Sequence, residues 1–256
     1  VGERFVNTAT SYDTLGFGKF SSEKSLAPFA LTVTDFHAKY DPKTNAPEDY
    51  KLDVEISYPI ESKAVHKVIK VNSPLTYGST KIYLQANGYS PMVSIKDKTG
   101  KIEFEGAVPF LPQDGNLTST GAIKLPDANP QIGIIGTFTP TYSMTNSKGA
   151  ISAFPEALDP RLVFSVWSGN LGLDSGIPQS VYRVDTSKMT RIGLKSLKVG
   201  ETYNFNEGSI TFVGWKPWVN IEVGRDPGKL IALFGALFAV MGLLASLFIG
   251  HRKEEV

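Results

Sequence analysis

The chain of 256 residues contains no cysteine. It can therefore form no disulfide and cannot use a thiolate as a nucleophile, a redox centre or a metal ligand, which excludes several classes of enzyme. The chain also lacks an excess of either charge, because 26 basic and 25 acidic residues give a formal net charge of +1. The basic residues are scattered along the sequence, so nucleic-acid binding is excluded as a function.

Catalytic motifs are lacking as well. The sequence has no G-x-S-x-G, P-loop, H-E-x-x-H or G-x-G-x-x-G pattern, and each of these patterns is a signature of a particular chemistry. The acidic residues form no pair that their spacing marks for acid–base catalysis, and a solvated face accounts for them. We therefore expect that the chain is not an enzyme.

Histidine is scarce, and the only three are His37, His66 and His251. No pair has the i, i+4 or short-loop spacing of a readable metal site, so no metal is predicted. For His37 and His66 the alternatives are ordinary strand histidines or ligands of haem. His251 is the third haem-ligand candidate, although a polar anchor at a membrane interface explains it more simply.

Long apolar runs are absent except for one near the C-terminus. Residues Leu230 to Gly250 include no charged side chain, and as a helix they would reach about 30 Å, the thickness of a hydrocarbon core. The pattern predicts a transmembrane helix over 229–250 and a tail over 251–256, with a buried core helix as the alternative. Asp226 and Pro227 are typical of a helix start, and Gly228 follows them.

Four small residues in this run recur at i, i+4, i+7 and i+11, and they predict a face that packs against another helix: Gly235, Ala239, Gly242 and Ser246. The flanking positive charges are balanced, so the sequence leaves open whether the body lies outside or inside the cytoplasm. Trp215 and Trp218 just upstream suit either a headgroup layer or the core of a strand.

Before the apolar run, short alternating stretches rich in Val, Ile, Thr and Tyr predict an all-β sandwich. Strands are expected at 29–40, 50–60, 64–71, 80–86, 91–96, 101–108, 132–138, 162–167, 180–184, 202–205 and 209–213. Gly100 and Gly208 are expected in hairpin turns. Residues 111–130 read as a loop that separates β-rich halves at 26–112 and 113–228, and short helices are expected over 187–197 and the first 20 residues.

Four blocks resemble the ResB proteins of system II cytochrome c biogenesis. They are RFVNTATSYDTLGFGKF, FALTVTDFHAKYDPKTNAPEDYKLDVEI, KVNSPLTYGSTKIYLQANGY and GRDPGKLIALFGALFAVMGLLASLFIGHRK, the first similar to actinobacterial members. The matching family-motif residues are Asn72, Pro74, Tyr83, Gln85, Gly88, Asp226, Pro227 and Gly228.

The resemblance implies about three preceding membrane spans, to which residues 1–25 would connect, a large extracytoplasmic domain and a last helix returning to the cytoplasm of a bacterium. It also implies a polytopic partner of the ResC or CcsA type that handles haem, and a joint role in haem attachment to apocytochrome c. The chain itself is expected to bind no cofactor, with haem possible in the complex. Apocytochrome could add a strand to a sheet edge, or the body could be plain structural support.

Two other functions remain open at this stage. One is a membrane-anchored β module for surface adhesion or solute binding. The other is a cytoplasmic tail-anchored β protein.

Overall fold

The computed structural model describes residues 2–7, 10–12, 16–17, 29–77, 80–147, 149–173, 180, 182–225 and 229–251, with side chains over 29–77, 80–147, 149–173, 180, 182–224 and 231–246. The strands are β1 Gly2–Asn7, β2 Thr10–Tyr12, β3 Gly16–Phe17, β4 Ala30–Tyr40, β5 Pro47–Ser57, β6 Val65–Lys70, β7 Leu75–Tyr77, β8 Thr80–Asp97, β9 Ile102–Ala107, β10 Leu111–Pro112, β11 Ser119–Leu125, β12 Gln131–Thr139, β13 Tyr142–Thr145, β14 Gly149–Ser152, β15 Arg161–Gly169, β16 Met189–Lys198, β17 Thr202–Phe205 and β18 Gly208–Arg225. One helix, α1, covers Lys229–His251. The prediction of a mainly β body followed by a C-terminal helix is confirmed.

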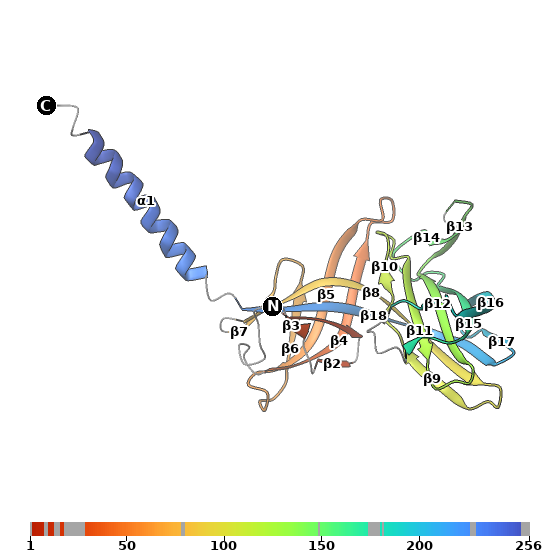
Figure 1. Ribbon diagram of the computed structural model, residues 1–256. Coiled ribbons are helices and arrows are strands. Elements are labelled where there is room, and N and C mark those ends of the chain that lie inside the picture. The colour runs from red at the N-terminus through yellow and green to blue at the C-terminus, as the bar shows by residue number, and fades with distance from the viewer. Residues whose placement is uncertain are drawn as a thin grey trace.

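The strands form three larger sheets and one two-stranded ribbon, with antiparallel pairing throughout (Figure 1). The first sheet has the order β3-β1-β18-β8-β7, with β17 on β18 and β9 on β8. The second has the order β2-β4-β5-β6 and the third β10-β11-β12-β15-β16, while β13 and β14 pair with each other.

Strands β8 and β18 are the spine of the molecule. Each has 18 residues, and they pair from Gly208↔Asp97 to Arg225↔Thr80. The sequence predicted 80–86 and 91–96 as separate strands because Pro91 interrupts them. Proline is tolerated here because the Pro91 carbonyl accepts from Val108 N, so the position of the missing N–H also lies on the side away from β18.

The two ends of this spine belong to two hydrophobic cores. One core packs the second sheet against the N-terminal part of β8 and the C-terminal part of β18, and its buried members are Leu31, Val33, Phe36, Leu52, Val54, Ile56, Ile69, Ile82, Val219, Ile221 and Val223. The other packs the third sheet against the opposite ends of the same two strands, through residues such as Val93, Phe138, Phe164 and Phe212. Burial of each such side chain contributes about 1.5–3 kcal/mol.

Several local predictions are wrong. β16, Met189–Lys198, stands where a helix is expected over 187–197, and the first 20 residues contain strands β1 to β3 where they are described. The expected loop over 111–130 contains β10 and β11, and the described part of 180–184 is not a strand. For β1, β11 and β16, pairing with a neighbouring strand of the sheet overrides the weak local pattern. The division at residue 112 stays a prediction.

The two upstream tryptophans belong to the β body. Trp218 is 2% exposed and donates from Nε1 to the carbonyls of Tyr89 and Phe110 at 3.2 and 3.0 Å. Trp215 packs against the core through an edge contact with Tyr89. The interpretation as strand-core tryptophans is confirmed for both.

Within the residues that the structure describes, no helix combines the length and the apolar character needed to cross a membrane.

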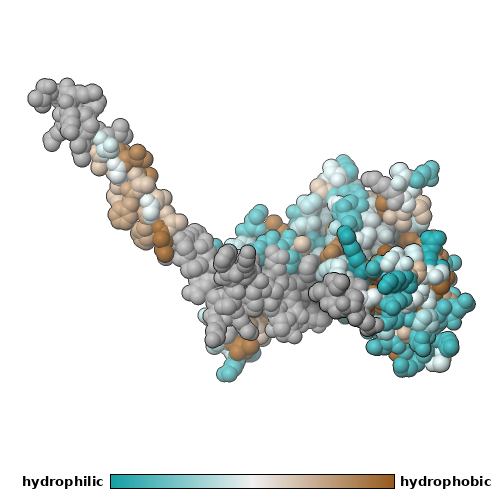
Figure 2. Space-filling view, in the orientation of Figure 1, coloured by the Kyte–Doolittle hydropathy of each residue, from teal (hydrophilic) through white to brown (hydrophobic). Residues whose placement is uncertain are grey.

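Helix α1 runs away from the sheets (Figure 1), and its described side chains, at 231–246, are exposed. Its large apolar residues include Ile231, Phe234, Phe238 and Leu243, which are 57–76% exposed. Figure 2 shows this helix as a hydrophobic rod, whereas hydrophilic side chains cover much of the part of the body formed by the third sheet. An unburied apolar surface of this kind calls for a partner or an apolar medium.

Candidate functional site

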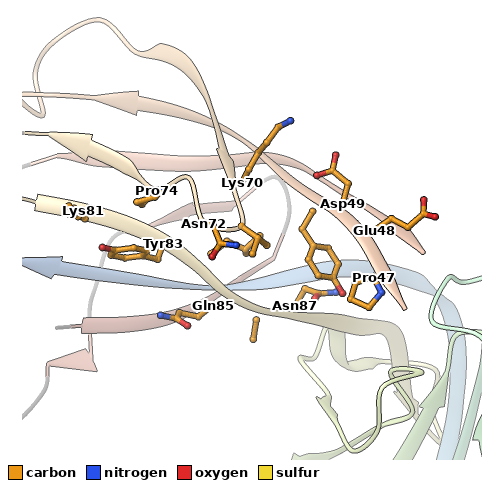
Figure 3. A pocket seen from close by; sticks show the side chains of 14 residues that line it. Pro47, Glu48, Asp49, Lys70, Asn72, Pro74, Lys81, Tyr83, Gln85 and Asn87 are labelled. Atoms are coloured by element: carbon orange, nitrogen blue, oxygen red, sulfur yellow. The ribbon is translucent and has the colours of Figure 1, made fainter. Parts of the chain in front are cut away.

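A groove of about 970 Å³ lies between β5 and β8, closed at one side by the turn after β6 (Figure 3). We call it the β5–β8 groove. It is lined by Pro47, Glu48, Asp49, Tyr50, Lys70, Val71, Asn72, Pro74, Lys81, Tyr83, Leu84, Gln85, Ala86 and Asn87. Its volume is at the upper end of the range of ligand-binding clefts.

The groove exists because β5 and β8 each lack a strand partner on one side at the same place. β6 pairs with β5 only from Lys51↔Lys70 onward, so Pro47–Tyr50 continues beyond the end of β6. On the other wall, β7 pairs with β8 over Thr80–Ile82 and β9 pairs with it from Met92 to Lys96. Between these stretches β8 has no strand partner on this edge among the described residues.

The turn that borders the groove depends on Asn72. Its φ is +64°, the left-handed conformation that asparagine tolerates better than most residues. The backbones of Lys70 and Ser73 exchange hydrogen bonds around it, with N···O distances of 3.4 and 3.0 Å. Pro74 follows and takes the chain towards β7. In Figure 3 the Asn72 side chain lies towards β8.

A β-bulge shapes the floor of the groove. The register of β8 with β18 shifts between Asn220↔Ala86 and Ile221↔Leu84, which leaves Gln85 as the extra residue. Bulges of this kind bend a strand and redirect a side chain. Gln85 donates a side-chain hydrogen bond to the carboxylate of Glu222 on the neighbouring strand, and this contact fixes its direction.

An aromatic cluster holds the β5 wall. Tyr50 stacks on Phe36 with ring centroids 5.9 Å apart and meets the edge of Tyr40 at 6.0 Å. Asn87 connects this cluster to β8, because its Nδ2 lies 3.5 Å from the Tyr40 hydroxyl. Burial raises the pKa of Tyr40 far above the usual value of a tyrosine, so this hydroxyl stays neutral.

Charged side chains occupy the two ends of the groove. Figure 3 shows Lys81 at one end and Glu48 and Asp49 at the other. Glu48 forms an ion pair with Lys39 at 2.6 Å, and this hydrogen-bonded carboxylate raises the pKa of Lys39. The middle of the groove offers amides and phenol rings, and Lys70 lies between the two ends with its amine directed away from β8 in Figure 3. Such a surface can hydrogen-bond a polar chain, but it carries no arrangement for covalent catalysis.

A scan against protein families matches the ResB-like family over residues 1–254. The chain belongs to this family. Searches of curated proteins and of solved structures gave no match. The ResB-like family is linked to cytochrome c biogenesis, in which its members are scaffold-type subunits of a complex. The resemblance predicted from the four sequence blocks is therefore confirmed.

The structure of this ResB-like chain brings four of the motif residues together. Asn72, Pro74, Tyr83 and Gln85 all line the β5–β8 groove, although up to 13 positions separate them in the sequence. Gly88 lies just beyond it, where a Cβ atom would come within 2.5 Å of the Trp218 ring. Asp226, Pro227 and Gly228 are outside the described residues.

Two of the three histidines also converge, which the sequence did not predict. Asp53 lies between them: its Oδ1 is 3.1 Å from His66 Nε2, within hydrogen-bond distance, and its Oδ2 is 3.6 Å from His37 Nε2. Asp35 and Lys51 complete this Asp53 cluster on the outer face of the second sheet. Each imidazole is about 60% exposed. The register that makes them neighbours depends on strand pairing, which no spacing in the sequence reveals.

The Asp53 cluster has no geometry of a metal centre, since no three His, Asp or Glu side chains in the described part of the chain are arranged to hold an ion. Haem ligation by His37 or His66 stays a prediction. The side chain of His251 is outside the described residues.

The small-residue face of α1 is open. Gly235, Ala239, Gly242 and Ser246 are all exposed, and a Cβ atom at Gly235 or Gly242 would meet nothing within 4 Å. The face is thus accessible to another helix, and its packing role stays a prediction.

Proposed function

We propose that this chain is a membrane-anchored, non-enzymatic subunit of a system II cytochrome c maturation complex. In this role it supports haem delivery and the covalent attachment of haem to apocytochrome c outside the cytoplasmic membrane. The observation that carries the proposal is the convergence of Asn72, Pro74, Tyr83 and Gln85 on one groove of a ResB-like chain. Motif residues scattered over a surface would favour structural roles alone.

Membrane anchorage is the second part of the proposal. The 21 residues from Leu230 to Gly250 carry no charge, and an apolar run of about 20 residues matches the hydrocarbon core of a bilayer. The exposed apolar side chains of α1 support the same interpretation. The β body would then lie on the extracytoplasmic side, and α1 would end towards the cytoplasm.

A polytopic membrane protein of the ResC or CcsA type is the proposed partner. The open face of Gly235, Ala239, Gly242 and Ser246 would let a partner helix approach closely. Haem chemistry would belong to the complex as a whole. Co-purification in mild detergent tests this contact: Gly242→Leu should release the partner, whereas Leu243→Ala on another face should retain it.

The decisive test is a strain that lacks this chain. In-gel haem staining should show that c-type cytochromes lose their covalently bound haem, while b-type cytochromes keep theirs. Expression of the full chain should restore the stain. Normal haem attachment in the deletion strain would refute the proposed function.

A further inference from the structure

β8 has an open edge between Tyr83 and Gly88, where no described strand pairs with it on the side away from β18. We propose that the β5–β8 groove binds an extended segment of a client polypeptide, whose backbone pairs with β8 between Tyr83 and Gly88. The inference deepens the proposed function. It rests on that function only for the identity of the protein that supplies the segment. The binding mode rests on the geometry of the groove.

The open edge has the dimensions of a missing strand. It begins after Ile82, where the pairing with β7 ends, and stops before Tyr89, whose carbonyl accepts from Phe110 N at 3.1 Å. The six residues between them extend over about 20 Å. A segment of four to six residues is a typical strand length, so a short extended peptide fits between β7 and the segment that follows β9.

The backbone groups of β8 point into this opening. Tyr89 lies opposite Pro217, and its carbonyl accepts from Phe110 N, so this carbonyl points away from β18 towards the groove side. Successive residues of a strand alternate in direction. Asn87, two residues earlier and opposite Val219, consequently directs its N–H and carbonyl to the same side. There it meets no strand partner among the described residues.

This stretch also lacks the charges that usually protect a sheet edge. The sequence from Tyr83 to Gly88 is YLQANG. By contrast, edge strand β9 carries two acidic residues, Glu103 and Glu105. Edge strand β16 carries three basic residues, Arg191, Lys195 and Lys198. Charges on an edge discourage pairing with other chains. Their absence in the groove favours the addition of a strand.

The ends of the groove define the charge pattern of the segment. Lys81 at one end suits an acidic residue, and Asp49 with Glu48 at the other end suits a basic residue (Figure 3). The middle of the segment would be uncharged, because it would face Gln85 and Asn87. The inferred ligand is thus an extended polypeptide with opposite charges at the two ends of a short polar or apolar stretch.

Fluorescence anisotropy on the full chain in detergent micelles tests this inference. The probe is a fluorescein-labelled peptide of about ten residues, rich in Thr, Ser and Val, with Glu near one end and Lys near the other. Two further peptides carry N-methyl groups on alternate residues, one on the odd and one on the even positions. Since only one set can donate to β8, one N-methylated peptide should bind about tenfold more weakly than the other.

The charge pattern is tested with Lys81→Glu. This variant should bind the probe about threefold more weakly, as expected for an ion pair near the surface. A second peptide, in which Lys replaces the Glu of the probe, should bind the variant as tightly as the probe binds the unmodified chain. Lys195→Glu, an exposed change on β16, is the matched control and should leave binding unchanged. Unchanged circular dichroism confirms that each variant is folded.

Three results would overturn the inference: no binding of any peptide, equal loss with both N-methylated sets, or an equal effect of the two lysine variants. Self-association of the chain through the groove, seen as dimers by light scattering that Lys81→Glu abolishes, would also overturn it. The haem-staining test is independent of these measurements. Peptide binding can therefore fail while the proposed function holds, and the reverse.

Discussion

Gly88 leaves no room for a side chain, and this explains why a motif residue so close to the groove is not part of it. A Cβ atom would come within 2.5 Å of Trp218 Cζ2. The indole cannot move away, because it is buried and its Nε1 donates hydrogen bonds to two backbone carbonyls. We expect Gly88→Ala to reduce the free energy of unfolding by about 1–3 kcal/mol.

Urea unfolding followed by tryptophan fluorescence measures this effect. Gly115→Ala is the matched control, because a Cβ atom there would meet nothing within 4 Å, and it should change stability by less than about 0.5 kcal/mol. Equal stabilities of the two variants would contradict the packing argument.

Two buried tyrosines predict a loss of stability at alkaline pH. Burial raises the pKa values of Tyr40 and Tyr89 well above the value of about 10 in an unfolded chain. The folded protein keeps both hydroxyls neutral, so their contribution is fully present below pH 10. It is lost as the pH rises further, because the unfolded chain then releases these protons first.

Tyr89→Phe tests this pH dependence. The variant loses the hydrogen bond from the Tyr89 hydroxyl to the Pro155 carbonyl, 3.0 Å long, and should be about 1–3 kcal/mol less stable at pH 7. Its stability should also fall less steeply above pH 10 than that of the unmodified chain. Tyr58→Phe, at an exposed tyrosine, should keep the original profile. Parallel alkaline curves for all three proteins would contradict the interpretation.

The resemblance to the ResB family identified Asn72, Tyr83 and Gln85 as motif positions, but it could not show that these side chains line one groove. That arrangement depends on the left-handed turn at Asn72 and on the bulge at Gln85. Both are features of pairing between strands, which sequence spacing does not encode.

At the scale of elements, the hairpin between β8 and β9 is closed by a carboxylate. Asp97 Oδ1 accepts from the backbone N–H and the hydroxyl of Thr99, both at 2.7 Å, and from Lys101 N at 3.0 Å. These hydrogen bonds lower the pKa of Asp97, with the Thr99 hydroxyl as the largest cause. The expected turn with Gly100 in the left-handed region is confirmed by its φ of +88°.

Asp97→Ala should therefore lower the unfolding temperature at neutral pH. A carboxylate with a lowered pKa stabilises the folded state above the unfolded value of about 4, and its contribution disappears as the pH falls through the folded value. The difference in unfolding temperature between the variant and the unmodified chain should shrink at acidic pH. Asp127→Ala, an exposed change outside this turn, is the control. A constant difference across this pH range would refute the role of the ionised group.

The element pattern also shows where sequence reasoning fails. Alternation predicted β4, β12 and β15 closely, because each has one buried face. The region 187–197 was mistaken for a helix because β16 is an edge strand with a weak alternation, in which Leu194 is 63% exposed. Proline at 91 and 217 hid the continuity of β8 and β18, since the direction of a missing N–H depends on the neighbouring strand.

At the scale of the whole molecule, the same two strands pass through both hydrophobic cores. Val219, Ile221 and Val223 of β18 lie in one core, while Ile210 and Phe212 of the same strand lie in the other. If one core unfolded, its part of β18 would separate from β8, and this would strain the β8–β18 pairing that continues into the other core. The β body should therefore unfold as one cooperative unit, although it contains two separate cores.

Substitution in one core tests this coupling in the full chain in detergent. Ile82→Ala removes a side chain that is 1% exposed in the core of the second sheet, and should cost about 2–5 kcal/mol. Native-state hydrogen exchange should then accelerate by similar factors in β5 and in β12, because both exchange through the same global opening. Met144→Ala, at a residue 61% exposed on β13, should change neither. If β5 lost its protection while β12 kept the original rate, the two cores would be independent domains joined only by covalent continuity of β8 and β18.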